Sequence, residues 1–215
     1  MTAPEVTILD YGLGNILNVS RGFSSLTDSY EVTAEPARLR EAKRLVVPGV
    51  GAFERSISAI RELGFDDLIR DFVDTGRPFL GICVGMQMLF EVSEEFGEHA
   101  GLGILKGRVV SVPSQTTEGH QQCVPHIGWN ALMSPESGRQ WDETLLEGTA
   151  DDEAMYFVHS FAAEPADEAV RLADCKYGGH RLSAAIQQDN IMATQFHPER
   201  SGEKGLMILR RFMGI

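Results

Sequence analysis

Hydrophobic and polar positions follow two patterns that alternate along the first half of the chain. Short runs of β-branched and apolar residues predict strands, whereas runs with an apolar residue at every third or fourth position predict helices. The strands are predicted at residues 5–11, 30–34, 44–51 and 77–83, and the helices at residues 16–26, 52–64, 65–76 and 84–96. Strands that alternate with helices at this spacing predict a parallel sheet covered on both faces.

The second half of the chain has a different pattern. It contains strand-like runs separated by short turns and by two polar loops, at 113–124 and around 134–143. The runs cover 102–113, 153–163, 170–179, 181–189 and 190–198, and a last helix is predicted at 202–213. The last two runs predict a hairpin that turns at Asp189 and Asn190. We therefore predict an α/β fold with a mostly parallel central sheet flanked by helices and an antiparallel C-terminal extension, in a single domain over residues 1–215.

The composition is that of a globular protein with one substantial core. The chain has 215 residues, of which 43% are hydrophobic, and a formal net charge of -12. Such a surface repels phosphate backbones and anionic lipids, which argues against a nucleic acid or a membrane as partner. The longest apolar stretch, residues 78–90, is shorter than the roughly 20 residues of a membrane-spanning helix. The N-terminal residues lack the basic and apolar regions of a secretory signal.

The cysteines do not indicate a disulfide framework. Cys83, Cys123 and Cys175 are an odd number at wide spacing, and no CxxC pair is present. A reducing cytoplasm is therefore the simplest location for the protein. His120 and Cys123 form half of a conceivable metal site, but no second half follows, so no metal is predicted.

One short stretch, Gly81-Ile82-Cys83-Val84-Gly85, joins a predicted strand to a predicted helix. A nucleophile at such a junction needs small neighbours, because the backbone is strained and larger side chains would clash. The N–H groups at the start of the helix would stabilise a thiolate and could donate to an oxyanion. Taken alone, the motif also fits a cysteine buried in the core, which is the commoner interpretation.

A thiol nucleophile needs a base, and the chain has six histidines. His197 differs from the others, because it ends a predicted strand and is followed by Pro198 and Glu199. Positions 197 and 199 project to the same side of an extended segment, so Glu199 can hold the imidazole in one tautomer. Cys83, His197 and Glu199 thus provide a nucleophile, a base and an orienting carboxylate. Solvated surface positions are predicted for three histidines in loop-like surroundings: His99, His120 and His180.

Six segments of the sequence resemble one known family. They are GICVGMQ at 81–87, QFHPERS at 195–201, DYGLGN at 10–15, VPGVGAF at 47–53, PHIGWN at 125–130 and YFVHSF at 156–161. In their order, their spacing and the total length, the chain is similar to the class I, triad-type glutamine amidotransferases, which have a flavodoxin-like fold. Within this class, PHIGWN and YFVHSF make it most similar to the glutaminase subunit of imidazole glycerol phosphate synthase.

The resemblance implies glutaminase chemistry. Cys83 would attack the side-chain amide carbon of L-glutamine, ammonia would leave, and water would hydrolyse the γ-glutamyl thioester to glutamate. His197 would take the thiol proton, deliver it to the leaving nitrogen and then activate the water, while Glu199 holds His197. A base of this kind contributes roughly 10²–10⁴ in rate.

The resemblance also implies where the substrate binds. The oxyanion hole would combine the N–H of Val84 with that of Val50 or Gly51, and loss of one such donor costs about 10²–10³ in rate. Gln87 lies one helical turn after Cys83 and so shares its face of the predicted helix. The substrate contacts implied by the family are Gly49, Gln87, His159, Ser160 and Phe161.

In the family, a second half-reaction belongs to a partner, a cyclase subunit with a (β/α)8 barrel. The resemblance therefore implies a heterodimer that passes ammonia to the cyclase in histidine biosynthesis, and it implies no cofactor. Ammonia in neutral water is mostly ammonium, which is not a nucleophile, so a shielded passage between the subunits is expected. Interface positions are implied at Asn15, Pro125 and Trp129, although core packing of Trp129 fits the sequence as well.

Small departures from the family pattern leave alternatives open. Val84, Phe161 and Arg200 stand where leucine, tyrosine and lysine are usual, and the connection from 129 to 156 is somewhat long. Some relatives of this subunit pair with a barrel that adds an amidine to a nucleotide-linked sugar, which is the alternative function. A non-catalytic docking subunit would have lost part of the triad, and all three residues are present. A stand-alone thiol hydrolase would need no partner, and the PHIGWN segment argues against it.

Overall fold

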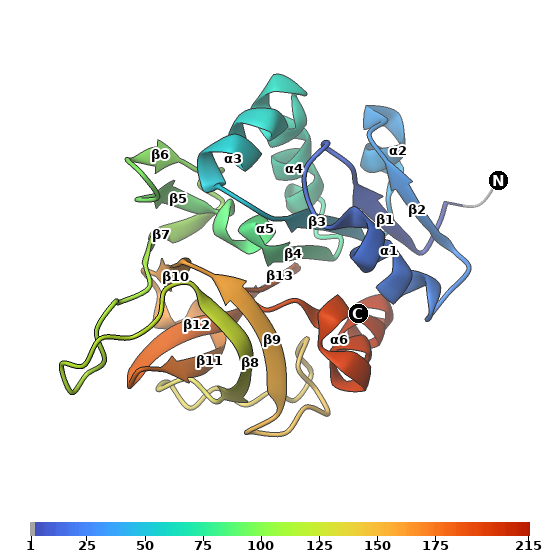
Figure 1. The fold of residues 1–215 in the computed structure, drawn as a ribbon. Helices are drawn as coiled ribbons and strands as arrows, with labels where there is room; N and C mark the ends of the chain where they lie inside the picture. The colour runs from blue at the N-terminus through green and yellow to red at the C-terminus, as the bar shows by residue number, and fades with distance from the viewer. Residues whose placement is uncertain (1–2) are drawn as a thin grey trace.

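One long sheet organises the computed structural model, which describes residues 3–215 (Figure 1). Its strands lie in the order β2-β1-β3-β4-β13-β12-β11-β8-β9. Their bounds are Tyr30–Thr33 (β2), Val6–Leu9 (β1), Leu45–Gly49 (β3), Phe79–Cys83 (β4), Ile191–Thr194 (β13), His180–Gln188 (β12), Arg171–Tyr177 (β11), His126–Met133 (β8) and Ala154–His159 (β9). From β2 to β13 neighbouring strands are parallel, and from β13 to β9 they are antiparallel. The predicted fold class is confirmed.

Helices cover both faces of the parallel strands. α3 (Phe53–Glu62) and α4 (Phe65–Asp74) pack together on one face, and α1 (Ile16–Ser24) and α6 (Gly202–Gly214) pack together on the other (Figure 1). The parallel strands are therefore buried on both sides, which explains the continuous apolar runs in the sequence. In the described range 3–215, no helix has the length and apolar character needed to cross a membrane.

β13 joins the two halves of the chain. It pairs in parallel with β4 and antiparallel with β12, the other arm of a hairpin. The hairpin turns at Asp189 and Asn190 as predicted, with Asp189 in the left-handed region at φ 51. Because Thr194 pairs with Ile82, the residues that follow β13 and β4 emerge side by side at one edge of the sheet. This edge, at the carboxyl ends of parallel strands, is where α/β sheets bind ligands.

A second, 4-stranded sheet lies beside the parallel strands, with the order β10-β7-β5-β6 (Figure 1). Its strands are Phe161–Pro165 (β10), Leu105–Ser111 (β7), Phe90–Ser93 (β5) and His99–Ala100 (β6). This sheet corrects the predicted helix at 84–96, because α5 comprises only Val84–Gln87 and the chain then enters β5. A short apolar run is compatible with the period of a helix and with that of a strand. Residues 90–93 form a strand because they pair with β7.

Three more segments differ from the sequence prediction. The run 153–163, predicted as one strand, is divided at Ser160 into β9 and β10, which belong to different sheets. β8 is absent from the prediction, because Gly128, at φ 138, interrupts the alternation of apolar and polar residues that marks a strand. α2 (Pro36–Glu41) begins at a proline, a typical helix start, but its 6 residues are too few to show a helical period. Two 3-10 turns complete the elements: Glu168–Val170 (η1) and Pro198–Arg200 (η2).

Candidate active site

Cys83 lies at a strained junction between β4 and α5. Its backbone has φ 56 and ψ -113, a region that residues other than glycine rarely occupy. A Cβ at Gly85 would lie 1.9 Å from the carbonyl oxygen of Val47, and one at Gly81 would lie 2.7 Å from that of Gly85, so the turn requires both glycines. The local geometry is the strand–turn–helix elbow expected from the sequence. Because α5 is a single turn, its dipole is weaker than that of the long helix predicted there.

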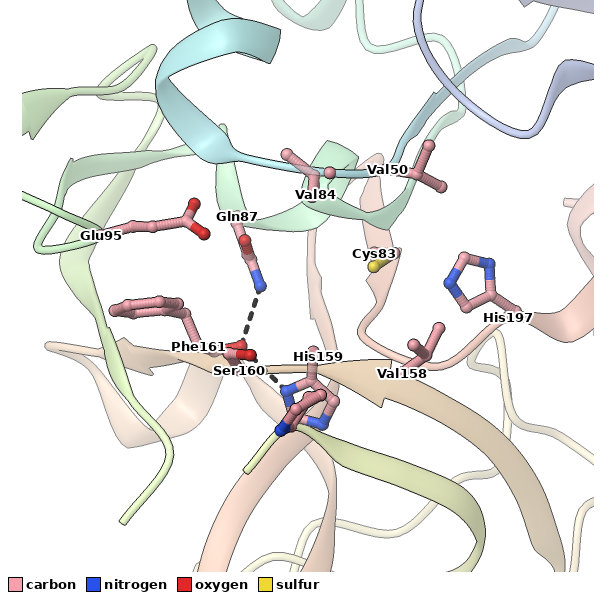
Figure 2. A pocket seen from close by; sticks show the side chains of 12 residues that line it. Val50, Cys83, Val84, Gln87, Glu95, Val158, His159, Ser160, Phe161 and His197 are labelled. Carbon is pink, nitrogen blue, oxygen red and sulfur yellow. Dashed lines mark hydrogen bonds between the residues drawn. The ribbon is translucent and has the colours of Figure 1, made fainter. Parts of the chain in front are cut away.

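His197 comes from the segment after β13. The strand ends at Thr194, three residues before His197, which was expected to end it, and a 3-10 turn begins at Pro198. Nδ1 of His197 lies 2.8 Å from Oε1 of Glu199, and both side chains are almost fully buried. A carboxylate only accepts, so Nδ1 carries a hydrogen and Nε2 is the atom free to exchange a proton. In the described part of the chain Nε2 has no aligned hydrogen-bond partner, and the ring faces the sulfur of Cys83 (Figure 2).

The surroundings of His197 favour its protonated form. Burial by itself lowers the pKa of the ring, but the interactions with Cys83 and Glu199 outweigh this effect and raise the pKa from 6.5 to about 10. A cationic ring beside the sulfur favours the ionised thiol, which is the nucleophilic form. The pair is therefore suited to begin a reaction as a thiolate and an imidazolium.

A cavity of about 320 Å³ opens in front of the Cys83 sulfur (Figure 2). This volume is near the lower end of the range typical of ligand sites, roughly 300–1,000 Å³. The cavity is lined by Val50, Gly51, Cys83, Val84, Gln87, Glu95, Pro125, Val158, His159, Ser160, Phe161 and His197. Every residue predicted for the oxyanion hole is in this wall, and so are all the predicted substrate contacts except Gly49.

Gly49 is buried beside the elbow, and its role in the structure is packing. It pairs with Cys83 across β3 and β4, and a Cβ on it would lie 2.8 Å from the backbone nitrogen of Gly85. The missing side chain lets β3 approach α5 closely. The cavity wall begins at the next residue, Val50.

The carboxamide of Gln87 has one orientation. Its Nε2 donates to the carbonyl oxygen of Phe161 and to Oε1 of Gln195, each at 2.9 Å. Two oxygens that accept require an NH₂ group between them, so a flipped amide would lose both bonds. Oε1 of Gln87 is then the acceptor that this side chain has available for a ligand.

Two neutral histidines form a buried pair behind Phe161. Nδ1 of His159 lies 2.9 Å from the Phe161 carbonyl oxygen (Figure 2), and its Nε2 lies 2.9 Å from Nδ1 of His126. The carbonyl only accepts, so His159 carries its hydrogen on Nδ1 and His126 donates to it. Burial lowers the pKa of His159 to about 3 and that of His126 to about 4. His159 thus holds the cavity wall as an uncharged donor.

The residues predicted at a partner interface are at least partly accessible. Trp129 is 59% exposed, which excludes the core packing that its sequence context left open. Its ring meets that of Tyr156 edge to face, with centroids 6.2 Å apart. Pro125 is exposed and lines the cavity. Asn15 is half-buried at the start of α1, outside the cavity wall.

Two polar residues of the site are absent from the sequence predictions. Glu95 lines the cavity and accepts a hydrogen bond from the backbone N–H of Phe53. The sequence predicts that Glu95 lies near the end of a helix over residues 84–96, so its position in the cavity wall was not expected. Gln195 is fully buried, and its Nε2 lies 3.6 Å from the sulfur of Cys83. The two-residue spacing from Gln195 to His197 is the signal that could have found it.

Comparison with known proteins places the chain in a family. The family described as glutamine amidotransferase class-I matches residues 7–214. The imidazole glycerol phosphate synthase subunit HisH 1 of Legionella pneumophila (strain Lens) is 47% identical over 211 residues, which cover 98% of this chain and 99% of the relative. The HisH subunit of Syntrophotalea carbinolica is 45% identical over 96% of this chain and 98% of the relative. That of Geobacillus thermodenitrificans is 42% identical over 98% of this chain and 95% of the relative.

Solved structures of low sequence identity share the fold. A crystal structure of a glutamine amidotransferase has a TM-score of 0.71 at 21% identity and covers 98% of this chain and 99% of its own. A glutamine amidotransferase from Thermotoga maritima has a TM-score of 0.61 at 16% identity and covers 98% of this chain and 84% of its own. The fold, the match along nearly the whole sequence and the named relatives agree. The chain belongs to the class-I glutamine amidotransferase family.

Proposed function

We propose that this chain is the glutaminase subunit of an imidazole glycerol phosphate synthase, with Cys83, His197 and Glu199 as its catalytic residues. The observation that carries the proposal is that the sulfur of Cys83 faces the ring of His197 (Figure 2), while Nδ1 of the same ring is hydrogen-bonded to Glu199. This order of nucleophile, base and carboxylate serves acyl transfer on several unrelated folds. The relatives that match over nearly the whole length carry this subunit's name, which supports the choice of subunit.

The reaction begins with attack of the thiolate on the side-chain amide carbon of glutamine. A C–S bond forms, and the π electrons of the carbonyl move to its oxygen. His197 then gives its Nε2 proton to the amide nitrogen, the C–N bond breaks and ammonia leaves. A pKa of His197 raised to about 10 keeps the proton available for this step, and Glu199 keeps the ring oriented.

The second step hydrolyses the γ-glutamyl thioester. His197, now neutral, takes a proton from water as the oxygen attacks the carbonyl carbon. The C–S bond then breaks, which restores the thiolate and the imidazolium and releases glutamate. We assign the oxyanion of both steps to the N–H of Val84 and an N–H of Val50 or Gly51, because all three residues line the cavity beside the sulfur.

The far end of the cavity suits the charged end of an amino acid. The carboxylate of Glu95 lies across the cavity from His197 (Figure 2) and offers a partner to an α-ammonium group. Oε1 of Gln87 is a second acceptor in the same wall. Ser160 and Phe161, at the junction of β9 and β10, complete this end with a hydroxyl and an aromatic ring. A substrate with an amide at one end and an ammonium at the other fits this distribution, as L-glutamine does.

An exposed apolar face near the cavity supports a protein partner. Ile127 and Trp129, two positions apart on β8, are each 59% exposed. The guanidinium of Arg200 lies 4.2 Å above the ring of Tyr156, which contacts Trp129. Grouped large apolar and aromatic side chains are typical of protein interfaces. We assign this face to a cyclase subunit with a (β/α)8 barrel, in a heterodimer that transfers ammonia without release to bulk water.

The alternative partner, a barrel that amidates a nucleotide-linked sugar, requires the same glutaminase site. The relatives with 42–47% identity are named as subunits of imidazole glycerol phosphate synthase, which favours the first partner. A non-catalytic subunit is disfavoured, because the nucleophile, base and carboxylate are all present at one cavity.

The test is a glutaminase assay with each candidate partner and its ammonia acceptor. We expect the cyclase of histidine biosynthesis to stimulate glutamate release and Cys83→Ala to lower it by about 10³-fold or more while the complex still forms. Cys123→Ser is the matched control, because Cys123 is an exposed cysteine away from the cavity wall. Stimulation by the nucleotide-sugar partner alone contradicts the choice of subunit, and full activity of Cys83→Ala contradicts the mechanism.

A further inference from the structure

The nucleophile has a second polar neighbour besides His197. Gln195 is fully buried, and its Nε2 lies 3.6 Å from the sulfur of Cys83, a hydrogen-bond distance for sulfur. The backbone N–H of Gln195 donates to the carbonyl oxygen of Ala184 at 2.8 Å. The hairpin of β12 and β13 therefore fixes the point from which this side chain reaches the sulfur.

The direction of this contact follows from two hydrogen bonds farther along. The carbonyl oxygen of Phe161 only accepts, so Gln87 turns its Nε2 toward it. The second hydrogen of that Nε2 goes to Oε1 of Gln195. Gln195 must then present its own Nε2, a donor, to the sulfur. A single backbone carbonyl thus fixes the orientation of both carboxamides.

We propose that Gln195 is a fourth catalytic residue, which donates a hydrogen bond from Nε2 to the thiolate of Cys83 and holds the sulfur in its attacking position. This inference rests on the proposed glutaminase function. A donor stabilises an anion more than a neutral thiol, so the bond increases the fraction of Cys83 that is ionised. It also restricts rotation of the Cys83 side chain, and a reacting atom held in line needs less reorganisation to attack.

A purely structural role for Gln195 makes a different prediction. A buried carboxamide that loses its partners lowers stability, whatever its part in catalysis. Gln187 serves as the control for this structural role. It belongs to the same hairpin as Gln195, and its Oε1 likewise accepts a hydrogen bond, from the backbone N–H of Leu145 at 2.8 Å. Gln187 is outside the cavity wall, so its loss changes stability without changing the surroundings of the sulfur.

The experiment measures how alkylation of Cys83 by iodoacetamide depends on pH. A Cys123→Ser background is used, since Cys123 is exposed and Cys175 is buried. Gln195→Met keeps the size of the side chain without the donor, and Gln195→Glu keeps its shape with an acceptor in place of the donor. We expect the pH midpoint of alkylation to rise by about one unit in the first variant and by more in the second. In the complex with the cyclase, kcat should fall about 10–100-fold, with KM for glutamine changed less than about threefold.

Gln187→Met is expected to lower the melting temperature without moving the midpoint. The proposal is overturned if both Gln195 variants lower the melting temperature while the midpoint and kcat stay at wild-type values. Alkylation needs neither turnover nor a partner. A shifted midpoint in a protein that shows no glutaminase activity would therefore contradict the proposed function and leave the contact of Gln195 with the sulfur supported.

Discussion

Glu199 determines much of the charge distribution at the site. Its side chain is fully buried, His197 donates to its Oε1, and its Oε2 has no hydrogen-bond partner among residues 3–215. A buried carboxylate is costly unless a cation compensates it. The imidazolium of His197 is that cation, and the same ring favours the thiolate of Cys83. The three groups therefore depend on one another for their charged forms.

Glu199→Gln keeps the size of the side chain and removes its charge. We expect the pKa of His197 to fall from its raised value, because the charge of Glu199, which helps to raise it, is lost. The kcat of glutaminase turnover in the complex should fall about 10²-fold or more, since the ring is no longer stabilised as a cation. Glu203→Gln, an exposed change in the first turn of α6, is the control and should retain activity. Equal activity of the two variants would show that Glu199 does not assist His197.

The proposed catalytic triad was accessible to sequence analysis because each part has a local signature. The glycines around Cys83 mark a tight turn, and Glu199 is two residues from the histidine that it orients. The buried support of the site has no such signature. His126 and His159 are opposite each other only because β8 pairs with β9, and Gln195 reaches Cys83 from the far end of the chain. Contacts between residues so distant in sequence depend on the folded sheet.

The contact of α5 with β3 depends on glycine at position 85. Gly85→Ala would place a Cβ 1.9 Å from the carbonyl oxygen of Val47, a backbone atom that cannot move without distorting β3. We expect a loss of at least about 3 kcal/mol in the free energy of unfolding, measured by denaturant titration, together with a loss of glutaminase activity. Gly214→Ala is the control, because no atom lies within 4 Å of a Cβ built at that position in α6. A stable and fully active Gly85→Ala protein would mean that the elbow is less tightly packed than this distance implies.

At the level of elements, the parallel strands and their helices were predicted well because each carries its own periodic pattern. The errors fall where a long-range partner decides the conformation. Residues 90–93 have the pattern of a helix, but pairing with β7 makes them a strand, and Ser160 divides one apolar run between two sheets. Both errors fall beside the cavity wall, because Glu95 follows the first segment closely and Ser160 itself lines the cavity. The sequence therefore predicted the strands and helices that support the site better than the segments that line its cavity.

On the scale of the molecule, the 9-stranded sheet makes the two halves of the chain interdependent. β13, from the second half, lies between β4 of the first half and β12. This arrangement supports the prediction of a single domain over residues 1–215, which remains a prediction; residues 1 and 2 lie outside the described range. It also places the proposed nucleophile, Cys83, at the end of β4 and the proposed base, His197, just after the adjacent strand β13, so the site forms only when both halves have folded together.

Two neutral histidines in the core make the stability of the whole molecule sensitive to acid. Burial holds the pKa of His126 at about 4 and that of His159 at about 3, whereas both are near 6.5 in an unfolded chain. Between pH 6.5 and 4 the unfolded chain therefore binds protons that the folded chain does not. Folding stability is lost as pH falls through this window, by up to about 1.4 kcal/mol per pH unit for each histidine. His197, with its raised pKa, acts in the opposite direction and only above pH 6.5.

His126→Phe tests this dependence, because phenylalanine can keep the stacking on Phe157 and Tyr177 but does not titrate. Denaturant titrations between pH 6.5 and 4 should show that the free energy of unfolding falls less steeply in the variant, by about 1.4 kcal/mol per pH unit. At pH 7 the variant should be less stable than wild type, since His159 loses its donor. His120→Gln, at an exposed position, should leave the slope unchanged. If the free energy of unfolding falls with equal slope in wild type and His126→Phe, His126 takes up a proton in the folded protein over the same pH range as in the unfolded chain. That result would contradict the uncharged state assigned to His126 and His159.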